Sequence, residues 1–285
     1  MDREYWTKGL DSGSGRRGSG HYFALAVGAA YLVVASLLCR LLSLVPGSGT
    51  KPASGNLSIL DVGPFFSENW NAAHIDALCE SMCVDKVAVI TQRPFDDIPK
   101  REFVVFSGRI ARFFGSGISR AFAAWRYARR ERPDLVIGYH LPWNGVVALL
   151  AARLIGCKAC YFAVGGPAEL IGGGRYSEHA LFSRLGADSP FLEHRLLAMA
   201  RRFDAILTMG SKSEAYFRDA TGCRHVCPMA VGIEPAIFAK RDAERHESYR
   251  YDVVAVGRHS RIKRVDVLLK AIARLAANDF PLNVA

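Results

Sequence analysis

Apolar and polar residues alternate along the chain in blocks that predict strands and helices by turns. Short runs rich in β-branched residues, typical of strands buried in a parallel sheet, stand between longer segments with a helical apolar face. The predicted strands are 57–63, 85–91, 132–140, 158–164, 204–209 and a short one at the start of 225–238. The predicted helices are 67–82, 107–132, 145–156, 191–203 and 211–219. This order predicts an α/β fold with a Rossmann-like parallel sheet covered on both faces.

The front of the chain differs from this pattern. Residues 1–20 are rich in Gly, Ser and charge, which predicts a disordered tail. Residues 21–46 are almost entirely apolar, and no charge lies between Arg17 and Arg40. A helix over the apolar run would be about 27 Å long, close to the hydrocarbon core of a bilayer. We therefore expect a single transmembrane anchor, followed by a linker at 47–56; a cleaved signal peptide and a buried soluble helix are the alternatives.

Composition narrows the possible partners. The 285 residues leave room for two domains, and half of them are hydrophobic. The formal net charge of +10 suits anionic partners. The sequence has no nucleic-acid-binding signature, so we expect that nucleic acid is not a partner. The odd count of seven cysteines argues against a disulfide framework and favours a reducing, cytoplasmic location for the catalytic region. Cys157 and Cys160 have zinc or redox spacing but run into a predicted strand, and no metal is predicted.

A basic stretch at 107–133 intersperses arginines with aromatic residues. Such a pattern predicts contact with an anionic membrane surface. The alternative is an ordinary domain helix, split in two at Gly115 and Gly117, with its aromatic side chains in the core and its arginines in water.

Ligands of parallel sheets bind beyond the carboxyl ends of the strands, so the loops that follow the strands are the candidate sites. These loops are 63–66, 140–144, 165–167 and 257–260. His140 is the candidate catalytic residue among them, although it also fits an ordinary loop histidine. The glycine-rich stretch 164–174 has the spacing of neither a dinucleotide fingerprint nor a P-loop, and is equally compatible with a turn and with a phosphate cradle.

The stretch 252–275 reads as a strand, a loop and an amphipathic helix. Gly257 permits a tight turn, and Arg258 and Lys263 flank the loop before the helix begins. Two cations near a helix N-terminus favour a diphosphate, because the helix dipole adds to their charge. A solvated basic loop is the alternative.

The sequence "VGRHSRIKRVDVLLKAIARL" resembles the opening of the donor domain in retaining glycosyltransferase family four, the glycosyl transferases group one, which have a GT-B fold. The residues that match the family pattern are Gly257, Arg258, Lys263, Asp266, Leu268, Leu269 and Ala271. Arg264 stands where the family usually has Gly. Weaker similarity extends back through 226–238, 192–217 and 132–142, so that the resemblance begins near Leu57.

The resemblance implies two Rossmann-like domains that face each other across a cleft, an acceptor-side domain at 57–240 and a donor domain that starts at 250–285. It implies a hexosyltransferase-type enzyme that uses a nucleotide-sugar, no further cofactor, no metal, and retention at the anomeric carbon. Arg258 and Lys263 would neutralise the diphosphate. The residues expected to line the cleft are Gly63, Pro64, Phe65, Gly165, Gly166 and Gly257.

The expected role is glycan or polysaccharide assembly with a glycan or lipid-linked acceptor at a membrane. Residues 250–285 hold only the first βα unit of a donor domain, truncated within that domain. We therefore expect the chain to be a fragment, or to need a partner chain that completes the domain, and to be inactive by itself. The alternative function is a non-catalytic acceptor-domain module that binds membrane or a partner subunit.

Overall fold

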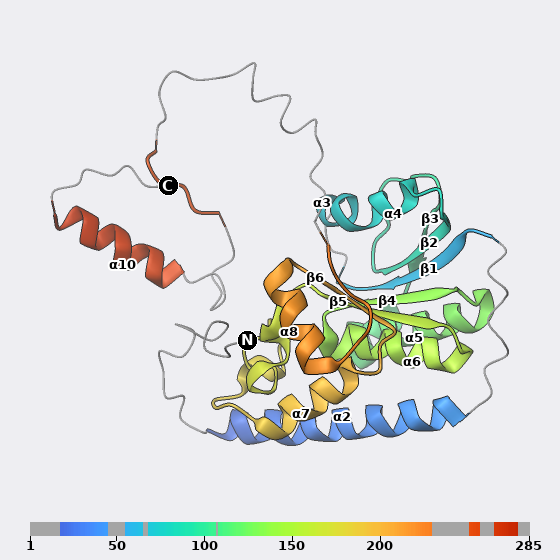
Figure 1. Cartoon of the computed structure of the whole chain (residues 1–285), viewed down its shortest axis with the longest axis horizontal. Coiled ribbons are helices and arrows are strands. Elements are labelled where there is room, and N and C mark those ends of the chain that lie inside the picture. Colours follow the sequence, from blue (N-terminus) through green and yellow to red (C-terminus); the bar gives the residue numbers. More distant parts are fainter. Residues whose placement is uncertain are drawn as a thin grey trace, which may run out of the picture. The chain divides into compact units, whose positions relative to one another are not determined.

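The computed structural model describes residues 18–44, 55–64, 68–106, 108–229, 251–256 and 265–278 (Figure 1). They belong to two compact units, a large one that ends before residue 233 and a small C-terminal one. The predicted tail and linker lie mostly outside the described residues.

The large unit is built on a parallel sheet of seven strands in the order β3-β2-β1-β4-β5-β6-β7. The strands are β1 Leu57–Val62, β2 Val84–Thr91, β3 Arg101–Val105, β4 Leu135–Tyr139, β5 Lys158–Ala163, β6 Ala205–Thr208 and β7 Val226–Pro228. Every neighbouring pair is parallel. The predicted α/β class and Rossmann-like sheet are therefore confirmed. The strand order reverses between β1 and β4, and such a switch point is where open α/β sheets bind ligands.

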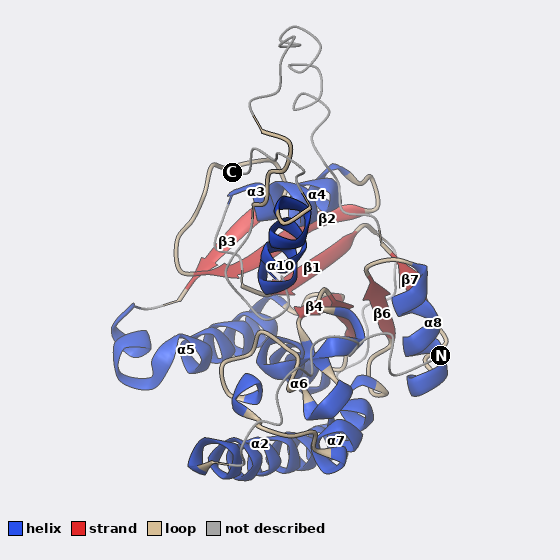
Figure 2. Cartoon of the chain, turned by 90° about the vertical axis from the view of Figure 1, so that its left-hand side faces the viewer, coloured by secondary structure: helices blue, strands red, loops and turns tan. Residues whose placement is uncertain are grey.

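Helices cover both faces of the sheet (Figures 1 and 2). The segment α3 Glu68–Asn71, η1 Ala72–Asp76 and α4 Ala77–Glu80 packs on one face through Ile75 and Cys79. A larger core on the other face is shared by α2, α5, α6, α7 and α8. These helices are α2 Ser19–Leu44, α5 Gly108–Glu131, α6 Val146–Ile155, α7 Pro190–Ala200 and α8 Ser211–Thr221.

The structure adds detail to two predicted helices and contains one strand that was not predicted. The predicted helix 67–82 contains a π-turn at Ala72–Asp76. In α5 the backbone of Gly115 is non-helical, with φ 83° and ψ 156°, so the expected split of this stretch occurs there. The edge strand β3 was not predicted, because its half-exposed and partly charged sequence, REFVV, has no continuous apolar run.

The helix α2 lies along the large unit and packs on α6 and α7 (Figure 1). Its buried residues recur every three or four positions and are His21, Ala24, Gly28, Leu32, Ala35 and Cys39. A Cβ atom on Gly28 would lie 3.0 Å from the ring of Phe182, so a glycine allows the close approach there. By length and composition alone, this helix of 26 residues could cross a membrane. The structure buries one stripe of it against the domain and leaves the opposite side exposed.

The side chain of Trp143, in the loop after β4, packs against both α2 and α5. Its ring stacks on Tyr31 of α2, with ring centroids 5.5 Å apart. A Cβ atom on Gly117 of α5 would lie 2.8 Å from the same indole. The loop that carries His140 is thus connected to α2 and α5 by direct packing.

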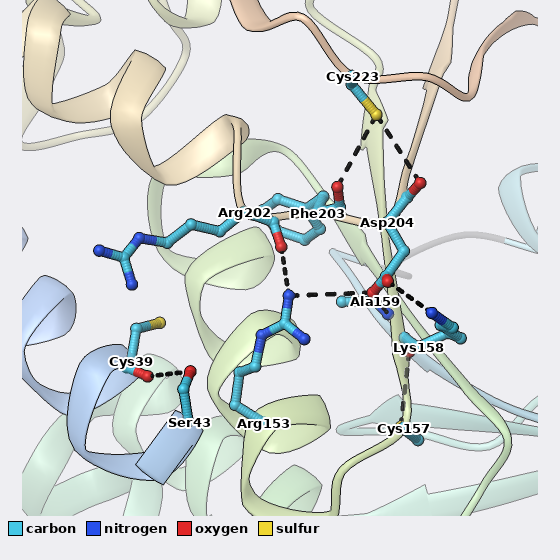
Figure 3. A network of polar contacts seen from close by, with 10 residues as sticks. All are labelled: Cys39, Ser43, Arg153, Cys157, Lys158, Ala159, Arg202, Phe203, Asp204 and Cys223. Atoms are coloured by element: carbon cyan, nitrogen blue, oxygen red, sulfur yellow. Dashed lines mark hydrogen bonds and ion pairs between the residues drawn. The ribbon is translucent and has the colours of Figure 1, made fainter. Parts of the chain in front are cut away.

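A network of hydrogen bonds and ion pairs lies at the edge of the sheet where the strands begin, opposite to the candidate loops (Figure 3). Asp204, just before β6, accepts hydrogen bonds from the Ala159 amide at 2.9 Å and from Lys158 Nζ at 3.0 Å. Arg153 of α6 donates to the carbonyl oxygen of Arg202 at 2.5 Å. The network joins α6, β5 and β6 and has a structural role.

The Cys157 and Cys160 pair lies at the start of β5, as its sequence context suggested. Burial raises the pKa of each thiol to about 12, which disfavours the thiolate that a metal ion needs. Within the described ranges, no group of three or more His, Cys, Asp and Glu side chains is arranged to hold a metal ion.

The small unit contains residues 251–256 and the helix α10 Val265–Ala276. The predicted helix is confirmed, whereas the predicted strand 252–256 shows one bridge residue, Val253. Gly257, Arg258 and Lys263 lie outside the described residues, so their predicted contact with a diphosphate stays a prediction.

Candidate functional site

The candidate site lies at the carboxyl edge of the sheet, around the loops that follow β1, β4 and β5. These strands are adjacent, with β4 between the other two. Gly63 and Pro64 follow β1, His140 follows β4, and Gly165 and Gly166 follow β5. The amide of His140 donates to the carbonyl oxygen of Phe162 at 3.2 Å, which joins the loop after β4 to strand β5. The structure thus brings three of the four predicted loops to one edge; Phe65 and the fourth loop, 257–260, lie outside the described residues.

The backbone of His140 has an uncommon conformation, with φ 64° and ψ 120°. Trp143, in the same loop, has φ 75° and ψ −75°. Positive φ values at residues with a Cβ atom cost on the order of 1–3 kcal/mol each and gather at active sites and ligand clamps. The fold holds this loop closed, because the Gly145 amide donates to the carbonyl oxygen of His140 at 2.9 Å.

The glycine of β4 makes this closed loop possible. A Cβ atom on Gly138 would lie 2.6 Å from the Cα atom of Gly145 and 2.7 Å from the Cβ atom of Ala148. Any side chain at Gly138 would push the start of α6 away from β4. The position of His140 is therefore defined by close backbone packing behind it.

Glu169 fixes the ring of His140. Its Oε1 atom lies 2.8 Å from His140 Nδ1, and its side chain is 1% exposed. The other oxygen, Oε2, accepts from the Leu141 amide at 2.7 Å and from the Tyr161 hydroxyl at 2.8 Å. The Gly165 amide donates to Oε1 at 2.7 Å. One carboxylate thus holds together the loops after β4 and β5.

Glycine is needed at position 165 for this arrangement. A Cβ atom there would lie 2.8 Å from Glu169 Oε1 and 2.9 Å from its Cγ atom. The predicted cleft-lining residue Gly165 therefore has a definite role, which is to let a buried carboxylate approach the loop.

The electrostatics of the pair favour an ionised Glu169. Burial by itself raises the pKa of this carboxyl group, but the facing charge of His140 and the hydrogen bonds from His140, Leu141 and Tyr161 outweigh it, so the pKa lies below its ordinary value. The ionised carboxylate keeps a proton on His140 Nδ1. The His140 side chain is 29% exposed, so a ligand can reach it.

The candidate site also affects the pKa of a second histidine, His179. Burial lowers the pKa of His179, and the positive charge of His140 lowers it further. A neutral His179 therefore stands near His140 at physiological pH.

The glycine-rich stretch at 172–174 is a packed turn. Gly172, Gly173 and Gly174 all have positive φ values. The Gly172 amide donates to Glu193 Oε2 at 2.7 Å, and those of Gly173 and Gly174 donate to the carbonyl oxygen of Leu170 at 3.1 Å. These three amides are engaged within the protein, so the structure favours the turn over the phosphate cradle.

Beside the site, β1 buries an acidic side chain. Asp61 is fully buried, and neither of its carboxyl oxygens has a hydrogen-bond partner in the described part of the chain. Burial raises its pKa well above the ordinary value, which favours the neutral acid. Asp61 shares its core with His74 and Tyr139, and His74 stacks on Trp70 with ring centroids 4.0 Å apart.

Sequence patterns pointed to His140 through its place at the end of a predicted strand, but they gave no indication of Glu169. The two residues are 29 positions apart, and their contact depends on the turn of the loop after β5. The available signal was an acidic residue within an otherwise apolar and glycine-rich stretch, four residues after Gly165.

Comparisons with known proteins give likeness at the level of the fold. No family model and no curated protein matches the chain. Among solved structures, the Glycyrrhiza uralensis UGT73P12 complexed with glycyrrhetinic acid 3-O-monoglucuronide is 15% identical with a TM-score of 0.39, over 71% of this chain and 57% of that one.

Two further solved structures are similar at the same level. A UDP-N-acetylglucosamine 2-epimerase is 13% identical with a TM-score of 0.43, over 78% of this chain and 61% of that one. The S. aureus MnaA–UDP co-structure is 14% identical with a TM-score of 0.47, over 81% of this chain and 60% of that one. The chain thus spans between 57% and 61% of the length of these structures. Likeness at this level does not transfer a substrate or a residue role.

Proposed function

We propose that this chain is the acceptor-side part of a glycosyltransferase that transfers a sugar from a nucleotide-sugar to an acceptor hydroxyl at a membrane. The observation that carries the proposal is the His140–Glu169 pair at the carboxyl edge of a Rossmann-like sheet, beside the switch point. The resemblance of residues 256–275 to a donor-domain opening supplies the nucleotide-sugar and the role in glycan or glycolipid assembly.

In this proposal His140 receives the acceptor. The mechanism uses the neutral form of His140, in which Glu169 keeps the ring proton on Nδ1 and Nε2 accepts a hydrogen bond from the acceptor hydroxyl. As the acceptor oxygen forms its bond to the anomeric carbon, its proton passes to Nε2 and Glu169 stabilises the imidazolium. The bond between the anomeric carbon and the diphosphate breaks ahead of this attack, its electron pair stays with the diphosphate, and the acceptor oxygen bonds to the same face of the sugar that the diphosphate leaves, which retains the anomeric configuration. Arg258 and Lys263 would neutralise that leaving group.

The proposed stereochemical outcome is retention, which follows from the resemblance alone. It is tested by the coupling constant of the anomeric proton in the product, measured by NMR early in the reaction. A product with the anomeric configuration opposite to that of the donor would contradict retention and would leave the roles of His140 and Glu169 to be judged by their own variants.

The central experiment is a transfer assay with the chain in an assembly whose donor domain is completed by further sequence or by a partner chain, a panel of labelled nucleotide-sugars and membrane lipid extract as acceptor; the chain by itself is expected to be inactive and is the blank. We expect His140→Ala to lower kcat by about 100- to 1,000-fold, the range for loss of a general base. The matched control is His194→Ala, since His194 lies exposed on α7. If His140→Ala transfers sugar as fast as the control, the pair has no part in transfer, and the chain acts as a non-catalytic acceptor-domain module.

A further inference from the structure

The outer side of α2 is an apolar surface without a partner among the described residues. Its large exposed side chains are between 39% and 78% accessible. They are Tyr22, Phe23, Val27, Val34, Leu37, Leu38, Leu41 and Leu44. Apolar surface of this extent along one helix is unfavourable in water and marks an interface with a membrane or another protein.

A groove opens beside this surface, between the second half of α2, the second half of α5 and the end of α6. Its volume is about 660 Å³, within the range of small-molecule sites. Its apolar walls are Leu38, Leu42, Phe122, Trp125, Leu150 and Leu154. An apolar groove of this size accommodates a hydrocarbon chain.

Three arginines of α5 also line the groove. Arg126 and Arg129 are exposed, and neither is paired with a carboxylate of the described residues. Arg130 pairs with Glu131 through Nε at 2.6 Å, which leaves its terminal guanidinium nitrogens available. Guanidinium groups bind phosphate oxygens in a bidentate manner. Apolar walls next to three arginines, two of them without a carboxylate partner among the described residues, match an amphiphile with an anionic phosphate head.

The groove lies toward the amino edge of the sheet, away from His140. The helix α6 begins next to the carboxyl end of β4 and ends before β5, so Leu150 and Leu154 belong to its amino-edge half. Cys39 of α2 lies in the same region, near Arg153 and Arg202 (Figure 3). The occupant of the groove is therefore not the acceptor that we place at His140.

The opposite end of α2 reaches the carboxyl edge. The amide of Gly186 donates to His21 Nδ1 at 3.2 Å, in the segment that follows the loops of β5. The helix thus runs along the domain on the outer side of α6 and α7 (Figure 1). A helix that crossed a bilayer alone would have to leave α6 and α7 and expose Leu32, which is fully buried in the main core.

We propose that α2 lies in the plane of a bilayer surface and that the groove between α2, α5 and α6 binds one anionic phospholipid. An acyl chain fills the groove, and Arg126, Arg129 and Arg130 bind the phosphate of the headgroup. This inference concerns membrane docking and does not depend on sugar transfer, so a failed transfer assay leaves it standing.

The first test is co-sedimentation of the full chain with vesicles of phosphatidylcholine alone or with phosphatidylglycerol added. Binding is expected with the anionic vesicles and is expected to weaken as salt rises. Changing Arg126→Gln and Arg129→Gln together should weaken partitioning by about 30-fold, since each arginine near an anionic surface contributes about a factor of five. The matched control changes Arg224→Gln and Lys270→Gln, two exposed cations outside the groove.

The second test asks whether an acyl chain of the lipid enters the groove. Phosphatidylglycerol with a brominated acyl chain should quench the fluorescence of Trp125, and Trp125→Phe should remove that part of the quenching. Inorganic phosphate, used as a competitor, should not release the protein, because it cannot fill the apolar walls.

Five outcomes would overturn the proposal. Equal binding to neutral vesicles, or equal binding by the two double variants, would remove the role of the arginines. Fluorescence quenching that does not depend on Trp125 would show that no acyl chain of the lipid lies in the groove. Resistance to alkaline carbonate extraction combined with unchanged binding of the arginine variant would indicate a spanning α2. If the chain forms a dimer in the absence of lipid and Trp125 is protected in that dimer, the apolar surface of α2 would be an interface between two copies of the chain.

Discussion

At the residue scale, the most consequential side chain is Glu169, because it connects two loops and positions His140. It accepts four hydrogen bonds, two at each oxygen, and has almost no access to water. A carboxylate this well paired is costly to disturb, since removing its charge leaves donors without a charged acceptor.

We predict that Glu169→Gln destabilises the protein by about 2–4 kcal/mol at pH 7. The pKa of Glu169 is lowered in the folded protein from its ordinary 4.5, so its ionised form adds stability above that pH. This contribution is lost as pH falls through the lowered folded pKa. Urea unfolding between pH 3 and pH 7 should therefore show the penalty of the variant shrinking toward acid. A penalty that is constant with pH would contradict the ionised state of Glu169.

Asp61 poses the opposite situation. It is buried without a hydrogen-bond partner in the described part of the chain, and its pKa is raised well above the ordinary 3.8. A raised folded pKa gives stability that is present below pH 3.8 and is lost as pH rises toward the folded pKa. At neutral pH the protein therefore loses stability through this group.

We predict that Asp61→Asn raises the free energy of unfolding at pH 7, because the carboxyl group ionises readily in the unfolded chain whereas burial disfavours its ionised form in the folded protein. The gain should shrink as pH approaches 4. Thermal unfolding at several pH values measures it, with Asp219→Asn on the exposed side of α8 as the control. A destabilised Asp61→Asn at pH 7 would mean that the carboxyl group has a partner in the native protein.

At the element scale, the sequence predicted most strands and helices but not how three of them behave. The strands β1, β2, β4, β5 and β6 were recognisable because buried parallel strands are continuous apolar runs. The edge strand β3 has exposed and charged positions, so no such run marks it. The π-turn at Ala72–Asp76 left no sign in the pattern, since one extra residue hardly changes a short helical period.

The helix α2 shows why composition alone gives an incomplete answer. A run without charges predicts insertion into a bilayer, and the length of the helix is sufficient. Its small and apolar residues at every third or fourth position also fit close packing against other helices of a domain, and the structure packs them on α6 and α7. Tertiary contacts with α6 and α7 are long-range information, which a window along the sequence does not contain.

We predict that Leu32→Ala lowers the stability of the domain by about 2–5 kcal/mol, because Leu32 is fully buried in the main core. The matched control is Leu41→Ala on the same helix, 60% exposed, which should change stability by less than about 0.5 kcal/mol. Denaturant unfolding of the full chain in one detergent, followed by tryptophan fluorescence, compares them; Trp143 stacks on Tyr31 and reports the docking of α2. Equal stability of the two variants would show that α2 is not docked.

At the scale of the whole molecule, the proposed chemistry is divided between two units. The acceptor chemistry rests on His140 and Glu169 in the large unit. The donor contact rests on Arg258 and Lys263, which the resemblance places at the start of the small unit and which lie outside the described residues. Loops at the carboxyl edge of a sheet could be anticipated from topology, whereas the contact of Glu169 with His140 depended on the three-dimensional course of one loop.

This division gives a prediction in which affinity and turnover separate. Replacing Arg258 and Lys263 together by Ala should weaken binding of a nucleotide-sugar by about 1.5–3 kcal/mol for each charged hydrogen bond lost, while the stability of the large unit stays unchanged. His140→Ala should lower kcat and leave the dissociation constant of the donor unchanged, because His140 contacts the acceptor. Calorimetric titration with the nucleotide-sugar and denaturant unfolding measure the two quantities. The control replaces Lys270 and Arg274 of α10 by Ala, which removes the same charge from exposed positions. Equal donor affinity in the two double variants would mean that Arg258 and Lys263 do not contact the diphosphate. The resemblance of this stretch to a donor site would then not extend to its chemistry.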